Sequence, residues 1–225
     1  MRTFILLSEK KWHVSLFEYL SRAKKNNWVR ISQKSDFNLD VLDAINPEII
    51  FIPHWSYIIP DSIVEKYTCI VFHMTDLPYG RGGSPLQNLI CNGFEQTKIS
   101  AIKVVRELDA GDIYLKKSLS LHGTAQEIFL RTVPIIEQMI GEIIENAFLP
   151  ESQEGDVVIF QRRKKEDGNI LKLETLKQVY DYIRMLDCEG YPNAYLEIEN
   201  FRLEFSRASF IDDQKIIADV RIIKK

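Results

Sequence analysis

One segment of this sequence, residues 71–88, combines the residue types that acid–base chemistry needs. His73 directly follows an apolar run that predicts a buried strand, and a turn with three glycines comes after it. An imidazole takes and gives protons near neutral pH, because its ordinary pKa is about 6.5. A lone histidine more often bonds a backbone group in the core. The rigid position of His73 at a strand end favours a catalytic role instead, as a general base or proton shuttle.

Two further loops hold residues suited to a binding site. Residues 107–112 (ELDAGD) form either an ordinary turn, since Asp and Gly both favour turns, or a source of a carboxylate at Asp109. Residues 53–60 (PHWSYIIP) either pack against helices or line an apolar slot for a flat heterocycle. Each loop is predicted to follow a strand, and ligands of open parallel sheets collect beyond the carboxyl ends of the strands. We therefore expect these loops and His73 to form one site.

Other chemistries lack their motifs. The dinucleotide and P-loop glycine patterns are missing, although Ser84 and Pro85 could begin a helix whose N–H groups face an anion. No nucleophile elbow and no Cys–His pair is present. His13, His54 and His122 have no acidic or cysteine partner at metal-ligand spacing, so no metal site is predicted.

Along the chain, short apolar runs typical of strands alternate with segments that have helical periodicity. This alternation predicts βαβ units, which would position these residues. The predicted strands cover residues 3–7, 28–31, 48–52, 68–72, 98–105 and 112–119. The predicted helices cover residues 12–25, 39–45, 60–67, 84–91 and 124–148. The last of these begins with the capping-box spacing of Thr124 and Glu127 and contains Pro134, which is expected to kink it. The pattern predicts an α/β fold with a Rossmann-like, open and mostly parallel sheet.

A polar, acidic segment at residues 150–156 predicts a domain boundary, with a catalytic domain over 1–150 and a small domain over 156–225. The second part has a basic run at 162–165, a helical pattern at 173–186 and three strand-like segments, which predict an α+β or open-barrel subdomain. Four aromatic residues there form either the interface of a homodimer or a core. They are Tyr191, Tyr195, Phe201 and Phe205.

Composition narrows the class of protein. The 225 residues are 45% hydrophobic and 27% charged, with a formal net charge of −3, which is typical of a globular protein and makes a nucleic-acid partner less expected. The apolar runs are too short to cross a membrane, and the first residues lack a signal-peptide core. Three cysteines without paired spacing predict a reduced, cytoplasmic protein.

Together, the segments resemble the formyltransferase family that uses N10-formyltetrahydrofolate, which includes methionyl-tRNA formyltransferase. The family pattern is Asn-x-His-x-x-x-Leu-Pro-x-x-x-Gly, followed about three dozen residues later by Leu-Asp-x-Gly-Asp. His73, Leu77-Pro78 and residues 108–112 match, and 36 positions separate His73 from Asp109. Val71 departs from the pattern, because the family has its catalytic asparagine there. Asn88 and Gln87 are the nearest side chains that could replace that amide.

The resemblance implies an enzyme that transfers a formyl group through a charged tetrahedral intermediate. His73, Asp109 and Asn88 would be the catalytic residues, and N10-formyltetrahydrofolate would be the formyl donor. Two loops would hold its pterin, through residues Trp55, Tyr57, Ile59, Arg106, Glu107 and Asp109.

The run HMTDLPYGRGGSPLQN resembles the sugar N-formyltransferase branch, of the type found in pseudaminic-acid pathways. The expected acceptor is therefore the amine of a nucleotide-linked amino sugar, with Lys10, Trp12 and Arg81 as substrate-binding residues. Residues 8–12 could instead be a charged loop with a buried Trp. The alternatives for function are a methionyl-tRNA or carrier-bound aminoacyl formyltransferase, or a silent folate-binding or sugar-nucleotide-binding relative.

Overall fold

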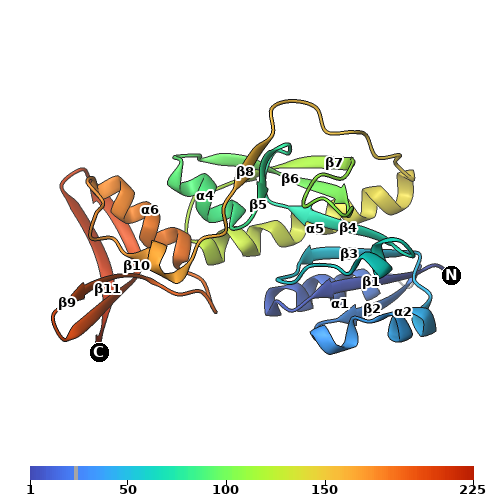
Figure 1. The fold of residues 1–225 in the computed structure, drawn as a ribbon, viewed down its shortest axis with the longest axis horizontal. Helices are drawn as coiled ribbons and strands as arrows, with labels where there is room; N and C mark the ends of the chain where they lie inside the picture. Colours follow the sequence, from blue (N-terminus) through green and yellow to red (C-terminus); the bar gives the residue numbers. More distant parts are fainter. Residues whose placement is uncertain (23–24) are drawn as a thin grey trace. The chain divides into compact units, whose positions relative to one another are not determined.

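The computed structural model describes residues 1–22 and 25–225 (Figure 1). The chain forms two compact units, and neither is continuous in sequence. Unit 1 comprises Met1–Arg81, Lys98–Leu119 and Arg131–Ile159, and unit 2 comprises Gly82–Thr97, Ser120–Leu130 and Phe160–Lys225. The division of the chain at residues 150–156 stays a prediction.

A six-stranded sheet with the strand order β2-β1-β3-β4-β6-β7 organises unit 1. Its strands are β1 (Thr3–Ser8), β2 (Asn27–Ile31), β3 (Ile49–His54), β4 (Thr68–His73), β6 (Gln96–Lys103) and β7 (Ile113–Ser120). β1 pairs in parallel with β2 and β3, and β3 pairs in parallel with β4. The predicted α/β class and the positions of these strands are confirmed. β1, β3 and β4 are apolar almost throughout and mostly buried, as expected for the central strands of a parallel sheet that is covered on both faces.

β6 is the exception to the parallel pattern. It runs antiparallel to β4, with Ile70 opposite Lys103 and His73 opposite Ser100. Residues 104–112 therefore leave the sheet beside the amino end of β4, where the N–H of Val104 donates to the carbonyl of Cys69 over 2.8 Å. The expectation that this loop lies beyond the carboxyl end of a parallel strand was wrong. The loop reaches the site by folding back.

The helices of unit 1 follow the sequence pattern closely. They are α1 (Val14–Arg22), preceded by the 3-10 turn η1 (Lys11–His13), α2 (Leu39–Ile45), α3 (Asp61–Val64) and most of α5 (Ala125–Asn146). The predicted helix over 12–25 extends into residues 23–24, which lie outside the described residues. The helix predicted over 60–67 is shorter in the structure. α5 runs through Pro134, and its capping box is present, since Thr124 and Glu127 bond each other's backbone N–H groups.

The glycine-rich turn after Pro78 contains a strand that the sequence did not predict. β5 (Tyr79–Gly82) pairs with β8 (Val158–Phe160) in a two-stranded sheet. The pairing begins where the N–H of Val158 donates to the carbonyl of Pro78. Glycine has low strand propensity, so a strand of sequence YGRG leaves no local signal.

Unit 2 packs α4 (Pro85–Cys91) and α6 (Leu176–Leu186) with a three-stranded antiparallel sheet of order β11-β10-β9. The strands are β9 (Ala194–Ile198), β10 (Phe201–Asp212) and β11 (Lys215–Lys224), as predicted apart from their bounds. Among the four aromatic residues, Tyr195 is buried and Phe201 is exposed, so a homodimer through this sheet stays a prediction.

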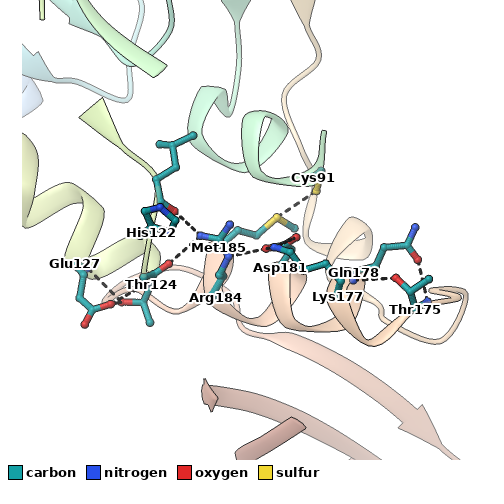
Figure 2. Close-up of polar contacts among 12 residues, drawn as sticks. Cys91, His122, Thr124, Glu127, Thr175, Lys177, Gln178, Asp181, Arg184 and Met185 are labelled. Carbon is teal, nitrogen blue, oxygen red and sulfur yellow. Dashed lines mark hydrogen bonds and ion pairs between the residues drawn. The ribbon is translucent and has the colours of Figure 1, made fainter. Parts of the chain in front are cut away.

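Arg184 on α6 is the polar centre of unit 2 (Figure 2). Its Nε donates to Asp181 over 2.6 Å, and its Nη1 donates to the carbonyls of Leu121 and Gly123. Both charged side chains are about 95% buried. Over residues 1–22 and 25–225, no helix is long and apolar enough to cross a membrane.

Candidate active site

His73 is the last residue of β4 and its side chain is 8% exposed. Its Nε2 lies 2.8 Å from the carbonyl oxygen of Gly80, in the turn that follows the strand. A carbonyl only accepts, so Nε2 must carry the proton of this hydrogen bond. The neutral ring therefore keeps the lone pair on Nδ1, and Nδ1 is the atom that can take a proton.

Asp109 provides the carboxylate that faces this atom. Its Oδ2 is 3.6 Å from Nδ1 of His73, and its side chain is 12% exposed. The distance is too long for a direct hydrogen bond but close enough for the carboxylate to stabilise a protonated ring. The structure thus brings together two predicted residues that lie 36 positions apart, although the loop of Asp109 starts at the opposite end of β4.

The segment behind His73 is fixed from two sides. Thr75 donates to the same Gly80 carbonyl, and Ser100 on β6 donates to the carbonyl of Thr75 over 2.7 Å. Lys116 and Lys98 both bond the Asp76 carboxylate. Partial burial acts to raise the pKa of Asp76, but the hydrogen bonds from the two lysines outweigh it and hold that pKa below its ordinary value. The turn that follows His73 is therefore held rigidly, and its Gly80 carbonyl orients the His73 ring.

The two loops expected to hold the pterin are joined in the structure. Arg106 pairs with Asp61, which directly follows the 53–60 loop, at 3.0 Å. Trp55 and Ile59 pack against the apolar core, so the packing interpretation holds for them. Tyr57 contacts the Trp55 ring at 5.3 Å between centroids and is 46% exposed.

The second loop exposes the apolar side chains Val105 and Leu108, the latter 65% exposed. Exposed apolar groups on two linked loops next to His73 and Asp109 fit a flat heterocycle, which buries its faces against apolar side chains. The residues present therefore suit a folate, with Tyr57 and the backbone around Arg106 and Glu107 as the groups that would hold it.

Arg81, predicted to bind substrate, is mostly buried and bonded within the protein. Its guanidinium donates to the side-chain oxygen of Gln153 over 2.8 and 3.0 Å and lies 3.5 Å from Glu107. Gln153 in turn donates to the carbonyls of Asp109 and Gly111. Gln153 was not among the predicted site residues, because it lies in the polar segment whose composition predicts a domain boundary.

Lys10 and Trp12 lie beyond the carboxyl end of β1, as expected for residues that meet a substrate. The Lys10 ammonium lies over the Trp12 ring, and the Trp12 ring meets His54 edge-on. His13 beneath them is 1% exposed and bonds Ser8 through Nδ1. Burial, helped by the positive charge of Arg30 and Lys10 and by His54, lowers the pKa of His13 to about 3. The cluster also contains a carboxylate, since Glu9 lies 3.5 Å from the Lys10 ammonium, and its role in binding stays a prediction.

The replacement for the missing asparagine remains a prediction. Val71 lies on the same face of β4 as His73, since the two are two residues apart on a strand, and it packs against the apolar core. In unit 2, the Asn88 amide donates to the carbonyls of Gly83 and Gln161, and Gln87 donates to Met185. Asn88 would have to give up one of these bonds to donate to a substrate.

Two family profiles match the chain. The profile described as "Formyl transferase" matches residues 17–129, about half of the chain. The profile described as "Methionyl-tRNA formyltransferase, C-terminal domain" matches residues 165–223.

Curated relatives carry the name methionyl-tRNA formyltransferase. The protein of Lactobacillus delbrueckii subsp. bulgaricus is 31% identical over 195 residues, which is 82% of this chain and 60% of the relative. The protein of Rickettsia felis is 26% identical over 80% of this chain and 61% of the relative. The chain thus spans about 60% of the length of these relatives.

A solved structure titled "Methionyl-tRNA formyltransferase from Clostridium thermocellum" is 49% identical with a TM-score of 0.97, and the match covers 100% of both chains. A sugar N-formyltransferase from a Shewanella species is 16% identical with a TM-score of 0.73, covering 92% of this chain and 97% of that one. HypX from Aquifex aeolicus, solved with tetrahydrofolic acid, is 15% identical with a TM-score of 0.75, covering 91% of this chain and 37% of that one. The last two share the fold. The more similar proteins do not carry the sugar-branch name that the sequence led us to expect.

Proposed function

Because the chain belongs to the formyl transferase family, we propose that it moves a formyl group from N10-formyltetrahydrofolate to the amine of methionyl-tRNA. The observation that carries the proposal is the pairing of His73 Nδ1 with the Asp109 carboxylate at 3.6 Å. A proton acceptor with a carboxylate beside it, next to loops that suit a folate, supports acyl transfer from that donor.

His73 would act as the general base. Its Nδ1 takes the proton that the attacking amine loses, while its Nε2–H stays bonded to the Gly80 carbonyl and keeps the ring in place. Asp109 then stabilises the imidazolium, because an opposite charge at this distance favours the protonated ring. The same Nδ1 returns the proton toward the leaving nitrogen.

The formyl donor would lie against the loops around Tyr57 and Leu108. When bound, N10-formyltetrahydrofolate supplies the one-carbon group that the acceptor amine receives. The exposed apolar side chains of the two loops would bury the faces of the heterocycle and exclude water there, and the exposed Arg106–Asp61 ion pair bridges the two loops.

Two observations support methionyl-tRNA as the acceptor. The relatives named above carry that activity in their names, one of them at 49% identity over the full chain. Unit 2 also has a basic run at residues 162–165, in which Arg162, Lys164 and Lys165 are exposed. Exposed cations neutralise phosphates, which dominate the affinity of proteins for nucleic acids.

The second candidate acceptor is a nucleotide-linked amino sugar. The observation that favours it is the formal net charge of −3, which suits a small acceptor better than a nucleic acid.

A direct comparison of acceptors tests the proposal. The chain is incubated with N10-formyltetrahydrofolate and either methionyl-tRNA or a panel of UDP-, dTDP- and GDP-linked amino sugars, and formylation is followed by mass spectrometry. We expect formyl-methionyl-tRNA as the main product. Formylation of an amino sugar alone would establish the second candidate instead, and folate binding without product on any acceptor would refute both.

A charge-neutralised variant separates the two acceptors further. Replacing Arg162, Lys164 and Lys165 by Ser should raise the KM for methionyl-tRNA about 10-fold or more and flatten its dependence on salt, with kcat unchanged. Replacing the exposed Lys215, Lys224 and Lys225 by Ser removes the same number of positive charges and is the matched control. An unchanged KM in the first variant would contradict a tRNA contact at this run.

A further inference from the structure

Gln153 is the one residue of 151–157 that is partly buried, and the other six are exposed. The backbone of Glu151 exchanges two hydrogen bonds with Ile113 at the start of β7, over 2.7 and 2.9 Å. This pairing docks the segment on unit 1 and turns Gln153 inward. The segment that the sequence predicts as a domain boundary is therefore attached beside the candidate site.

The side-chain amide of Gln153 is fully bonded. Its Nε2 donates to the carbonyl oxygens of Asp109 and Gly111, both over 2.8 Å. Its Oε1 accepts from Nε and Nη2 of Arg81 over 3.0 and 2.8 Å. A primary amide offers two N–H donors and two lone pairs, so all of its hydrogen-bonding capacity goes to this contact.

The loop that Gln153 holds has an unfavourable backbone. Asp109 adopts a φ of 52°, a left-handed conformation that residues with side chains rarely adopt. The chain then passes so close to β6 that a Cβ on Gly111 would lie 1.7 Å from the carbonyl oxygen of Lys103. A loop in such a conformation persists only where its surroundings hold it, and its shape is what brings the Asp109 carboxylate to His73.

We propose that Gln153, oriented by Arg81, is a positioning residue that holds residues 109–111 in the shape that sets the distance between Asp109 and His73. The bonds to the two carbonyls on either side of Ala110 fix the turn, and the Arg81 guanidinium fixes the amide so that its N–H groups and not its oxygen face the loop. Arg81 thereby has a role in the site without touching a substrate. The kinetic part of the test rests on the proposed function.

The kinetic test uses the full chain with Gln153→Met, which keeps the shape and removes the hydrogen bonds. We expect kcat to fall about 10- to 100-fold, since misplacement by about 1 Å can cost that much, with the KM for the acceptor within about 2-fold. Ser152→Ala and Glu154→Gln, at the exposed neighbours, are the controls and should leave both constants unchanged. In an Asp109→Asn background, Gln153→Met should cost less than about 3-fold, because it acts through the same carboxylate. An equal loss in both backgrounds would overturn the proposal.

A further variant separates the role of the Gln153 amide oxygen, which accepts from Arg81, from that of its two N–H donors. Gln153→Glu keeps an acceptor for Arg81 but removes both donors, so kcat should fall at least as far as in Gln153→Met. Full activity in Gln153→Glu would show that the bonds to the loop carbonyls do not matter and would overturn the proposal.

Two measurements that need no formyl transfer complete the test. Ala110 donates its N–H to the carbonyl of Glu107, and hydrogen exchange at this amide reports opening of the turn. We expect Gln153→Met to speed that exchange about 10-fold or more and to move the ¹⁵N shifts of the His73 ring toward those of Asp109→Asn. Unchanged exchange and unchanged ring shifts would overturn the proposal even if kcat fell. If the wild-type chain formylates no acceptor, the proposed function fails, and these measurements still decide the role of Gln153.

Discussion

Each unit of the protein buries an acid–base pair, and the two pairs are bonded differently. In unit 2, Arg184 and Asp181 are 2.6 Å apart, and the guanidinium also donates to two backbone carbonyls. In unit 1, Nδ1 of His73 lies 3.6 Å from Oδ2 of Asp109, and Nε2 of the ring lies 2.8 Å from the Gly80 carbonyl oxygen. Both pairs are nearly excluded from solvent.

This difference in bonding distinguishes a pair that stabilises the fold from a pair that can exchange a proton with a ligand. A buried charge whose bonds are all made is costly to disturb and stays fixed in one ionisation state. A histidine whose second nitrogen faces a carboxylate beyond hydrogen-bond length can still exchange a proton with a ligand. We therefore expect variants of the first pair to lose stability and variants of the second to lose activity.

The largest effect should come from Arg184→Met. It leaves Asp181 buried without its main partner and removes the donor to the carbonyls of Leu121 and Gly123, at a cost of about 3–5 kcal/mol in the free energy of unfolding. Denaturant titration of the purified variant measures this. The double variant Arg184→Met with Asp181→Leu should recover much of the lost unfolding free energy, because it leaves no unpaired buried charge. A stable single variant would show that this pair contributes little.

Asp109→Asn should have the opposite profile. The amide keeps the shape but cannot stabilise a protonated His73, so kcat should fall about 100-fold, which is about 2.7 kcal/mol in the barrier. The unfolding free energy should change by less than about 1 kcal/mol, since no short bond from the His73 ring to this side chain is lost. A loss of stability as large as that of Arg184→Met would remove the contrast between the two pairs.

His13 provides a third buried group, and its effect depends on pH. Its pKa is about 3 in the folded protein and about 6.5 when unfolded, so acid protonates the unfolded chain first. The stability contributed by the neutral ring is present above pH 6.5 and is lost as the pH falls toward 3. This amounts to about 2 kcal/mol between pH 7 and pH 5. His13→Gln should flatten the dependence of unfolding free energy on pH by this amount, and the exposed His122→Gln should not. Equal pH profiles for wild type and His13→Gln would refute the assignment.

The smallest effect is expected at Lys177. It contacts the same Asp181 over 2.9 Å, but its side chain is 53% exposed. Exposed ion pairs contribute about 0–1 kcal/mol because water and side-chain entropy offset the attraction. Lys177→Ala should therefore change the unfolding free energy by less than about 1 kcal/mol in the titration used for Arg184→Met. A larger change would mean that Asp181 depends on both cations.

The sequence predicted the elements whose patterns are local. The apolar runs of β1, β3 and β4 mark strands buried on both faces, and Thr124 with Glu127 marks the start of α5 through bonds within one turn. The approach of Asp109 to His73 was expected from the family resemblance, whose motif contains both segments. The hydrophobic pattern alone does not show that these two segments meet.

The features that the sequence missed depend on contacts between distant segments. The reversed direction of β6 is set by pairing with β4, and a strand's own pattern does not show its direction. Gln153 has exposed polar neighbours on both sides, so nothing local marks it as the residue that turns inward. Asp181 and Arg184 look like the charged face of an amphipathic helix, and their burial follows from the packing of α6 in unit 2.

In the proposed reaction, Nδ1 of His73 takes the proton of the attacking amine. The direct test is kcat for formyl transfer by His73→Gln, whose amide can still donate to the Gly80 carbonyl but cannot accept a proton at neutral pH. We expect kcat to fall about 100-fold or more with the unfolding free energy preserved. A folded His73→Gln protein with kcat within about 3-fold of wild type would contradict it.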